Sequence, residues 1–191
     1  MSLFDTRNTS ASTDAITGTV SPATLLNAAS LKWFKSYLSK IDNERHYHLW
    51  TGGQWNMHDL LSYLLTHTGK SDLFLTTYSI SEDSIRKLIY MLNTGVISSV
   101  NMILDYSAKE YKSNALLLAQ EHFNVALCPM HAKVCAIRNV AWNISITGSA
   151  NWTRNPKAER LVICTSKNVV NDDIAMIESL LRNEQPFKVR L

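Results

Sequence analysis

The chain has 191 residues, of which 46% are hydrophobic, and this is enough apolar material to bury a core. Its formal net charge is only +3, so an anionic partner must be held by locally clustered basic residues rather than by bulk charge. No uncharged apolar run approaches the length of about 20 residues that spans a bilayer, so no stable membrane insertion is expected. Residues 1–22 lack the apolar segment of a secretory signal. We therefore expect a flexible leader over 1–22, a single domain over 23–191 and a cytoplasmic location.

Hydrophobic periodicity predicts helices over 23–41, 56–68, 82–92, 109–120 and 169–182. It predicts strands over 46–50, 73–78, 100–104, 123–127, 131–138, 142–147 and 160–165. Gly69 is expected to end the second helix, and Asn139 to turn a hairpin between the fifth and sixth strands. This alternation is typical of the α/β class, with a mixed β-sheet flanked by helices on both faces.

Three cysteines are present, Cys128, Cys135 and Cys164, and none forms a CxxC pair. An odd number without close pairs favours reduced, buried thiols over a disulfide framework. His46 and His48 lack further ligands at a recognisable spacing, so neither a metal nor another cofactor is expected.

A His-x-Lys pair begins the predicted strand over 131–138. Because side chains alternate along a strand, His131 and Lys133 are expected to point to the same face. A base and a cation would then share one pocket, while Arg138, by the same alternation, points to the opposite face.

A second set of polar residues follows the next strand. Gly148 permits close backbone approach, and Ser149 and Asn151 stand two residues apart, offering a hydroxyl and an amide to the oxygens of a phosphate. Glu159 opens the following strand, where its carboxylate could accept a proton from one ring nitrogen of His131 and leave the other free to attack.

Each feature has an ordinary structural explanation, because a single strand histidine is usually structural and Gly-Ser-x-Asn is a common turn. Their conjunction over Met130–Thr165 closely resembles the half-site of the phospholipase D-like (HKD) superfamily, including its small single-motif nuclease members. The predicted strands over 73–78 and 100–104 also resemble the sheet that precedes this site in the family. Residues 1–70 show no such match.

The resemblance implies a metal-independent phosphodiester exchange in which one histidine attacks phosphorus to form a phosphohistidine and a second histidine protonates the leaving oxygen. His131, Lys133, Ser149, Asn151 and Glu159 take the catalytic positions. Because the chain has one His-x-Lys motif, the resemblance implies a homodimer in which two half-sites meet across a twofold axis.

Two departures from the family pattern bear on activity. Arg138 occupies the position of the family's Asp, and Glu159 follows Asn151 more closely than is usual in the family. Two interpretations therefore stay open: an active enzyme, or a catalytically degenerate dimer that binds nucleic acid or protein.

A nuclease is the first expectation for the substrate, because basic residues gather around the motif. They are Lys133, Arg138, Arg154, Lys157, Arg160 and Lys167, against the single acid Glu159. Trp152, Arg154 and Lys157 are the expected substrate-binding residues. Trp142 and Trp152 could stack on bases, although core or interface packing explains them equally well. Phospholipid hydrolysis ranks lower, because no membrane-seeking helix is evident.

Overall fold

The structure, a computed structural model, describes residues 20–111, 113–153 and 155–182, so most of the expected leader lies outside the described residues. Its strands form one seven-stranded sheet in the order β1-β7-β6-β5-β2-β3-β4. They are β1 (His46–Thr51), β2 (Ser71–Thr77), β3 (Ile97–Asp105), β4 (Asn124–Cys128), β5 (Val134–Arg138), β6 (Asn143–Gly148) and β7 (Glu159–Cys164). Strands β2, β3 and β4 run parallel, and the other neighbouring pairs are antiparallel. The predicted mixed sheet is confirmed.

The helices of the described residues alternate with the strands much as the periodicity predicts. They are the 3₁₀ helix η1 (Pro22–Leu25) and the α-helices α1 (Ala28–Tyr37), α2 (Met57–Thr68), α3 (Glu82–Asn93), α4 (Ala108–Tyr111), α5 (Ser113–His122) and α6 (Lys167–Leu181). The helix predicted over 23–41 is two helices, because the Asn27 side chain accepts a 2.8 Å bond from Ser30 N and starts α1 anew. The helix predicted over 109–120 corresponds to α4 and α5, between which residue 112 lies outside the described residues.

Local signals set the bounds of α2. Asn56 and Asp59 form a capping box at its start, in which each side chain accepts a hydrogen bond from the other residue's backbone N–H. Gly69 ends it with a φ of 73°, a conformation that costs a glycine little. Asn139 turns the β5-β6 hairpin as predicted, its side chain accepting from the N–H groups of Ala141 and Trp142.

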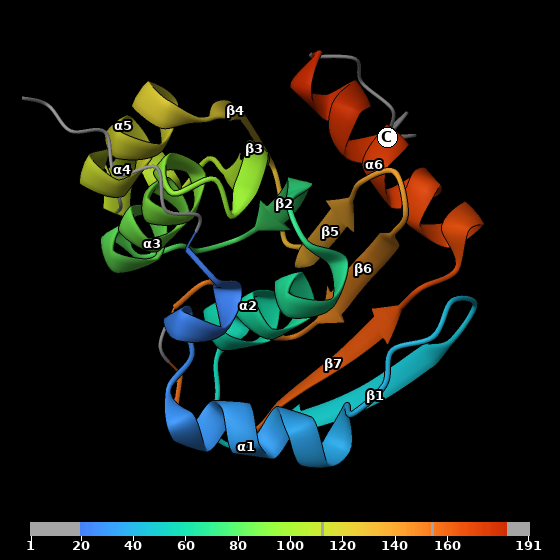
Figure 1. Cartoon of the computed structure of the whole chain (residues 1–191). Helices are drawn as coiled ribbons and strands as arrows, with labels where there is room; N and C mark the ends of the chain where they lie inside the picture. Colours follow the sequence, from blue (N-terminus) through green and yellow to red (C-terminus); the bar gives the residue numbers. More distant parts are fainter. Residues whose placement is uncertain (1–19, 112, 154, 183–191) are drawn as a thin grey trace, which may run out of the picture.

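Helices cover both faces of the sheet, with α6 on one side and α1, α2, α3 and α5 on the other (Figure 1). The alternation along β5 shows the division. Cys135 and Ile137 belong to the larger core beneath α2, whereas Ala136 packs with Val170 and Ile174 of α6. Cys135 and Cys164 are buried and Cys128 is half-buried, and all three are free thiols.

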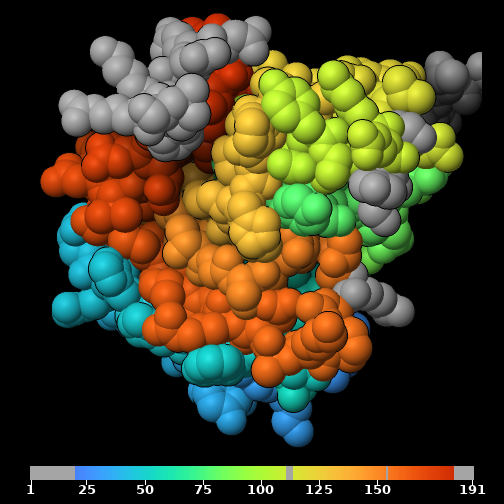
Figure 2. Space-filling view, turned by 180° about the vertical axis from the view of Figure 1, so that it is seen from behind, coloured from blue at the N-terminus to red at the C-terminus, as the bar shows by residue number. Residues whose placement is uncertain are grey.

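The strand directions bring several chain segments to one edge of the sheet. Strands β2, β3, β4 and β6 end there, and β5 and β7 begin there. Figure 2 shows this face: the green end of β2 is surrounded by the yellow-green residues after β3, the yellow residues before β5 and the orange residues after β6. Within the described residues, no helix is both long enough and apolar enough to cross a bilayer.

Candidate active site

The His-x-Lys segment lies directly before β5 and not within it. The expected strand over 131–138 begins only at Val134, because the backbone before it forms hydrogen bonds with a side chain of β2 where a strand would pair with backbone. The Thr76 hydroxyl donates to the Ala132 carbonyl at 2.9 Å and accepts from Val134 N at 3.2 Å. This hydroxyl ties the segment to the end of β2 and leaves His131 exposed at the sheet edge.

His131 and Lys133 lie on one side of this segment, around the ring of Tyr78. The His131 and Tyr78 ring centroids are 5.4 Å apart, and Lys133 Nζ lies 6.0 Å from the Tyr78 centroid. Lys133 Nζ also donates a 2.7 Å bond to the His131 carbonyl. The two side chains share one side as expected, although the segment is not a strand, and the result is an exposed imidazole beside the ammonium group of the half-buried Lys133.

Ser149 and Glu159 are brought together, but not in the expected roles. The Ser149 hydroxyl donates to the Glu159 carboxylate and accepts from Arg160 N at 3.1 Å. The other carboxylate oxygen of Glu159 accepts from Asn155 Nδ2. Glu159 is 8% exposed. Its hydrogen bonds in this single chain thus hold the β6-β7 loop, and none among the described residues joins it to His131.

The expected use of Ser149 as a phosphate donor stays a prediction, and its contacts within this chain favour a different role. A hydroxyl has one hydrogen, and that of Ser149 is already directed at Glu159. A buried carboxylate is a strong acceptor, so the bond is costly to give up. Ser149 therefore positions the loop, and the sequence offered no sign that the two predicted residues bind each other.

Asn151 is anchored by β2. Thr77 Oγ1 lies 3.2 Å from Asn151 Oδ1 and 3.0 Å from the Ser79 carbonyl, and its hydrogen is shared between these acceptors. With its oxygen held by Thr77, the Asn151 amide nitrogen is the group left to donate to a ligand. Asn151 is thus placed at the same sheet edge as His131.

Trp152 cannot stack on a base, because it is only 2% exposed, and this corrects its expected role in substrate binding. Its carbonyl accepts from Ser81 N at 3.1 Å and from Ser84 Oγ at 2.7 Å, and its ring centroid lies 4.8 Å from that of His58 with the two rings nearly perpendicular. Trp142 is half-buried against the larger core. For Trp152 the packing explanation holds.

The expected basic ligands have separate outcomes. Lys157 is exposed on the β6-β7 loop, where its N–H bonds to Asn155 Oδ1 at 3.0 Å. Arg154 lies outside the described residues. Among the described residues no group of three or more His, Cys, Asp and Glu is placed to hold a metal ion.

Arg138 lies at the far end of β5 from His131. Its guanidinium donates to Glu178 of α6 at 3.2 Å and lies 4.6 Å from the centroid of the Phe74 ring. The prediction that Arg138 points away from the His131 face is therefore confirmed. The residue in the family's Asp position serves here to join β5 to α6.

Three site residues escaped the sequence reasoning: Thr77, Tyr78 and Asp105. Asp105 ends β3 and accepts 2.9 Å bonds from Met130 N and Ser107 N. Burial opposes its ionisation, but these N–H donors outweigh it, so the pKa of Asp105 is lowered. Their place at the ends of predicted parallel strands was the available signal.

A known protein family and several solved structures are similar to this chain. The family described as cardiolipin synthase, PLD-like domain, matches residues 61–181. NucT from Helicobacter pylori has a similar structure with a TM-score of 0.53 and 17% identity, covering 72% of this chain and 97% of that one. Nuc from Salmonella typhimurium, a phospholipase D family member, gives 0.53 and 18%, with 73% and 95% covered.

A polyphosphate kinase also contains a region with a similar fold. Polyphosphate kinase from Porphyromonas gingivalis gives a TM-score of 0.54 and 16% identity, covering 90% of this chain but 30% of the kinase. Comparison with curated protein sequences gives no match. Identities this low establish the fold alone, whereas the family match spans more than half of the sequence. The chain belongs to the phospholipase D-like family.

Proposed function

We propose that the chain is a metal-independent phosphodiesterase, acting as a nuclease, whose active site is completed by a second copy of the chain. The observation that carries the proposal is the exposed His131, which shares a cluster with Lys133 at the edge where Asn151 is held. A nucleophile, a cation and an amide donor at one edge suit a phosphodiester. One chain supplies a single imidazole to this edge through its His-x-Lys motif.

The chemistry needs two imidazoles. A ring nitrogen of His131 attacks phosphorus, a P–N bond forms, and the P–O bond to the leaving oxygen breaks. The partner subunit's His131 gives its proton to that oxygen and then takes a proton from water. The water oxygen bonds to phosphorus, the P–N bond breaks, and a phosphate monoester leaves with His131 restored.

The remaining residues stabilise or position. Lys133 and Asn151 provide N–H donors for the non-bridging oxygens, on which charge increases during the reaction. Ser149 and Glu159 hold the loop that carries Asn151, through the hydrogen bonds of β7. In this scheme a carboxylate and its hydroxyl partner act through geometry rather than by contact with the phosphate.

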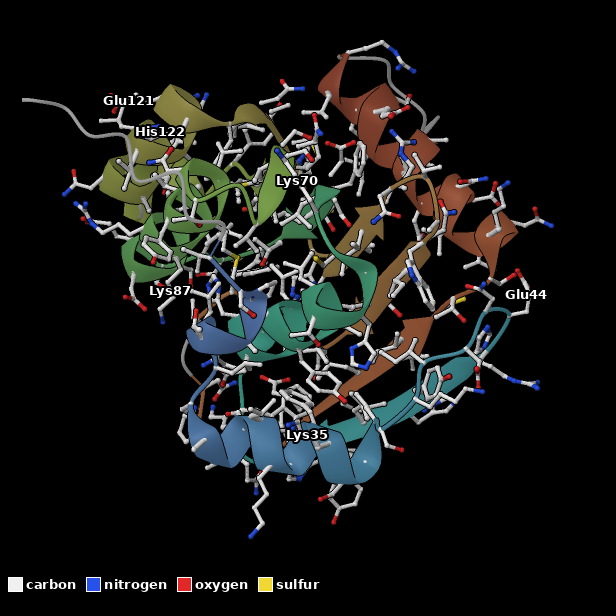
Figure 3. All side chains as sticks on the ribbon, in the orientation of Figure 1. Lys35, Glu44, Lys70, Lys87, Glu121 and His122 are labelled. Atoms are coloured by element: carbon white, nitrogen blue, oxygen red, sulfur yellow. The ribbon has the colours of Figure 1, made fainter. Side chains whose placement is uncertain are left out.

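Cleavage assays in excess chelator test the reaction. Labelled single- and double-stranded DNA and RNA are incubated with wild type, His131→Asn and His122→Asn. His122 is a matched control, because it ends α5 just before β4 begins, which is the opposite edge of the sheet from His131; Figure 3 labels it on this helix. We expect cleavage by wild type and His122→Asn alone. Equal activity of all three proteins would exclude His131 as the nucleophile.

Mixed dimers test the shared site. If two copies of His131 are needed, a dimer with one wild-type and one His131→Asn subunit is inactive. After subunit exchange in an equal mixture, activity per total chain should fall to about one quarter, since only wild-type pairs remain active. A fall to about one half would show that each chain works alone.

The second candidate is a catalytically degenerate dimer that binds nucleic acid, favoured by Arg138, whose bond to Glu178 puts a structural arginine in the family's Asp position. It predicts tight binding without cleavage of any substrate in the same assay. Phospholipid hydrolysis remains the third candidate, and release of headgroup from labelled vesicles by wild type but not His131→Asn would favour it.

A further inference from the structure

Two exposed tyrosines lie at the edge that carries His131, and the proposed reaction uses neither. Tyr78 is 42% exposed and Tyr106 is 50% exposed. Tyr78 directly follows β2 and Tyr106 directly follows β3. These two strands are paired in parallel, with Thr77 opposite Leu104, so the two rings emerge from neighbouring strand ends.

A lysine accompanies each ring. Lys133 Nζ lies 6.0 Å from the Tyr78 centroid, and Lys109 Nζ lies 5.6 Å from the Tyr106 centroid. Proteins that bind single strands combine aromatic faces, on which bases stack, with cations that follow the backbone phosphates. The two tyrosine-lysine pairs have this composition, and one of them adjoins the His131 ring.

The backbone that presents both rings is held in place. Next to Tyr78, Thr77 is fully buried, and Ile80 is 2% exposed and forms a bridge with Trp152. After β3, the turn containing Tyr106 is closed by a 3.1 Å bond from Lys109 N to the Tyr106 carbonyl. Rings mounted on ordered backbone lose little further freedom when a base stacks on them, which favours binding.

Resting on the proposed nuclease function, we propose that Tyr78 and Tyr106 form a stacking platform for unpaired bases, with Lys133 and Lys109 holding the adjoining phosphates. A duplex hides its base faces in its own stack, whereas a single strand offers them to the rings. The platform therefore selects single-stranded nucleic acid and places one of its phosphates beside His131.

Binding is measured in the His131→Asn background, so that no chemistry intervenes. Fluorescent single-stranded, duplex and abasic oligonucleotides of equal length are titrated with this parent and with added Tyr78→Leu, Tyr106→Leu or Tyr78→Phe. Tyr90→Leu is the matched control, since Tyr90 is 49% exposed near the far end of α3. The abasic strand keeps the phosphates and removes the bases.

We expect each leucine variant at Tyr78 or Tyr106 to bind the single strand about tenfold more weakly, as loss of a base stack predicts. Tyr78→Phe and Tyr90→Leu should match the parent, and the abasic strand should bind parent and leucine variants equally. Unchanged single-strand affinity in both leucine variants, or an equal loss for abasic and duplex oligonucleotides, would overturn the platform. A parent that binds no single strand would overturn it too.

The two proposals fail separately. If wild type cleaves nothing while the leucine variants lose single-strand affinity as described, the nuclease is wrong and the platform stands. If wild type cleaves through His131 but cuts duplex and single strand equally, with affinities unchanged by the leucine variants, the nuclease stands and the platform is wrong.

Discussion

Met130 N donates a 2.9 Å hydrogen bond to Oδ2 of Asp105, which ties the residue before His131 to the end of β3. Asp105 also accepts from Ser107 N at 2.9 Å, so one carboxylate orders the approaches to both His131 and Tyr106. These donors lower the pKa of Asp105 against the opposing effect of burial.

Replacing Asp105 with Ala is therefore expected to impair the site. The change removes hydrogen bonds to a charged group, which typically contribute about 1.5–3 kcal/mol of stability. It also frees the His131 segment, so cleavage should fall at least about tenfold, as expected when reacting groups are misplaced. Asp72→Ala is the control, because Asp72 accepts from Ser99 Oγ at the other end of the parallel strands. Similar losses of activity in both variants would contradict a local role for Asp105.

The Asp105 carboxylate also has a defined pH signature. Its folded pKa lies below the ordinary value of 3.8, so its contribution to stability is present above that value and is lost as pH falls through the lower folded pKa. Wild type and Asp105→Ala should therefore converge in unfolding free energy as the pH is taken below about 4. Urea unfolding at pH 3 and pH 6 measures this.

The burial of His58 predicts that the free energy of unfolding also depends on pH in a higher range than for Asp105. Burial, aided by Lys87 and opposed by Asp83, lowers the pKa of His58 from 6.5 to about 3, and both buried ring nitrogens find no hydrogen-bond partner among the described residues. Below pH 6.5 the His58 ring is protonated in the unfolded chain but stays neutral in the folded protein. The free energy of unfolding therefore falls as the pH drops. His58→Leu should reduce the loss of unfolding free energy between pH 7 and pH 5 by roughly 2 kcal/mol.

His122→Leu is the control for this pH experiment, because His122 is exposed at the end of α5. Its unfolding free energy should vary with pH as that of wild type does. If His58→Leu keeps the full wild-type pH dependence, His58 is not the group that titrates on unfolding.

Gly148 is expected to accept no side chain. A Cβ at this position would lie 2.9 Å from the Leu161 Cα and closer still to the Arg160 carbonyl oxygen. Strands β6 and β7 would have to separate, which in a packed region costs about 1–3 kcal/mol. Gly148→Ala should lower the denaturant midpoint accordingly. Gly52→Ala, whose Cβ comes no nearer than 3.5 Å to Gln54, should not.

Restoring the family's Asp is expected not to raise activity. In Arg138→Asp the new carboxylate would face the carboxylate of Glu178, and the contact between the Arg138 guanidinium and the Phe74 ring would be lost. Like charges and the lost cation–π contact together should cost about 1–2 kcal/mol. The double variant Arg138→Glu with Glu178→Arg should recover part of that loss. A gain in cleavage by Arg138→Asp would show instead that this position acts at the site.

Local patterns were sufficient for most of the fold. The alternation of helix and strand, the stop at Gly69 and the turn at Asn139 all follow from neighbouring residues, and the structure confirms them. The predicted ends of segments were less accurate where a side-chain oxygen, and not a backbone carbonyl, accepts the hydrogen bond of a backbone N–H. Thr76 does so before β5, and Asn27 does so before α1.

The sequence by itself determined the order of the elements, the face of the sheet to which each β5 side chain points, and the combination of residues that marks the family. Periodicity and motifs depend only on residues close together in the sequence. Only the tertiary structure decided which strand ends meet. It buried Trp152 beneath residues of α2 and α3, directed the Ser149 hydroxyl to Glu159, and placed Tyr78 and Asp105 beside the His131 segment. These contacts join residues distant in sequence, and they depend on strand order and register, which the alternation of apolar residues does not specify.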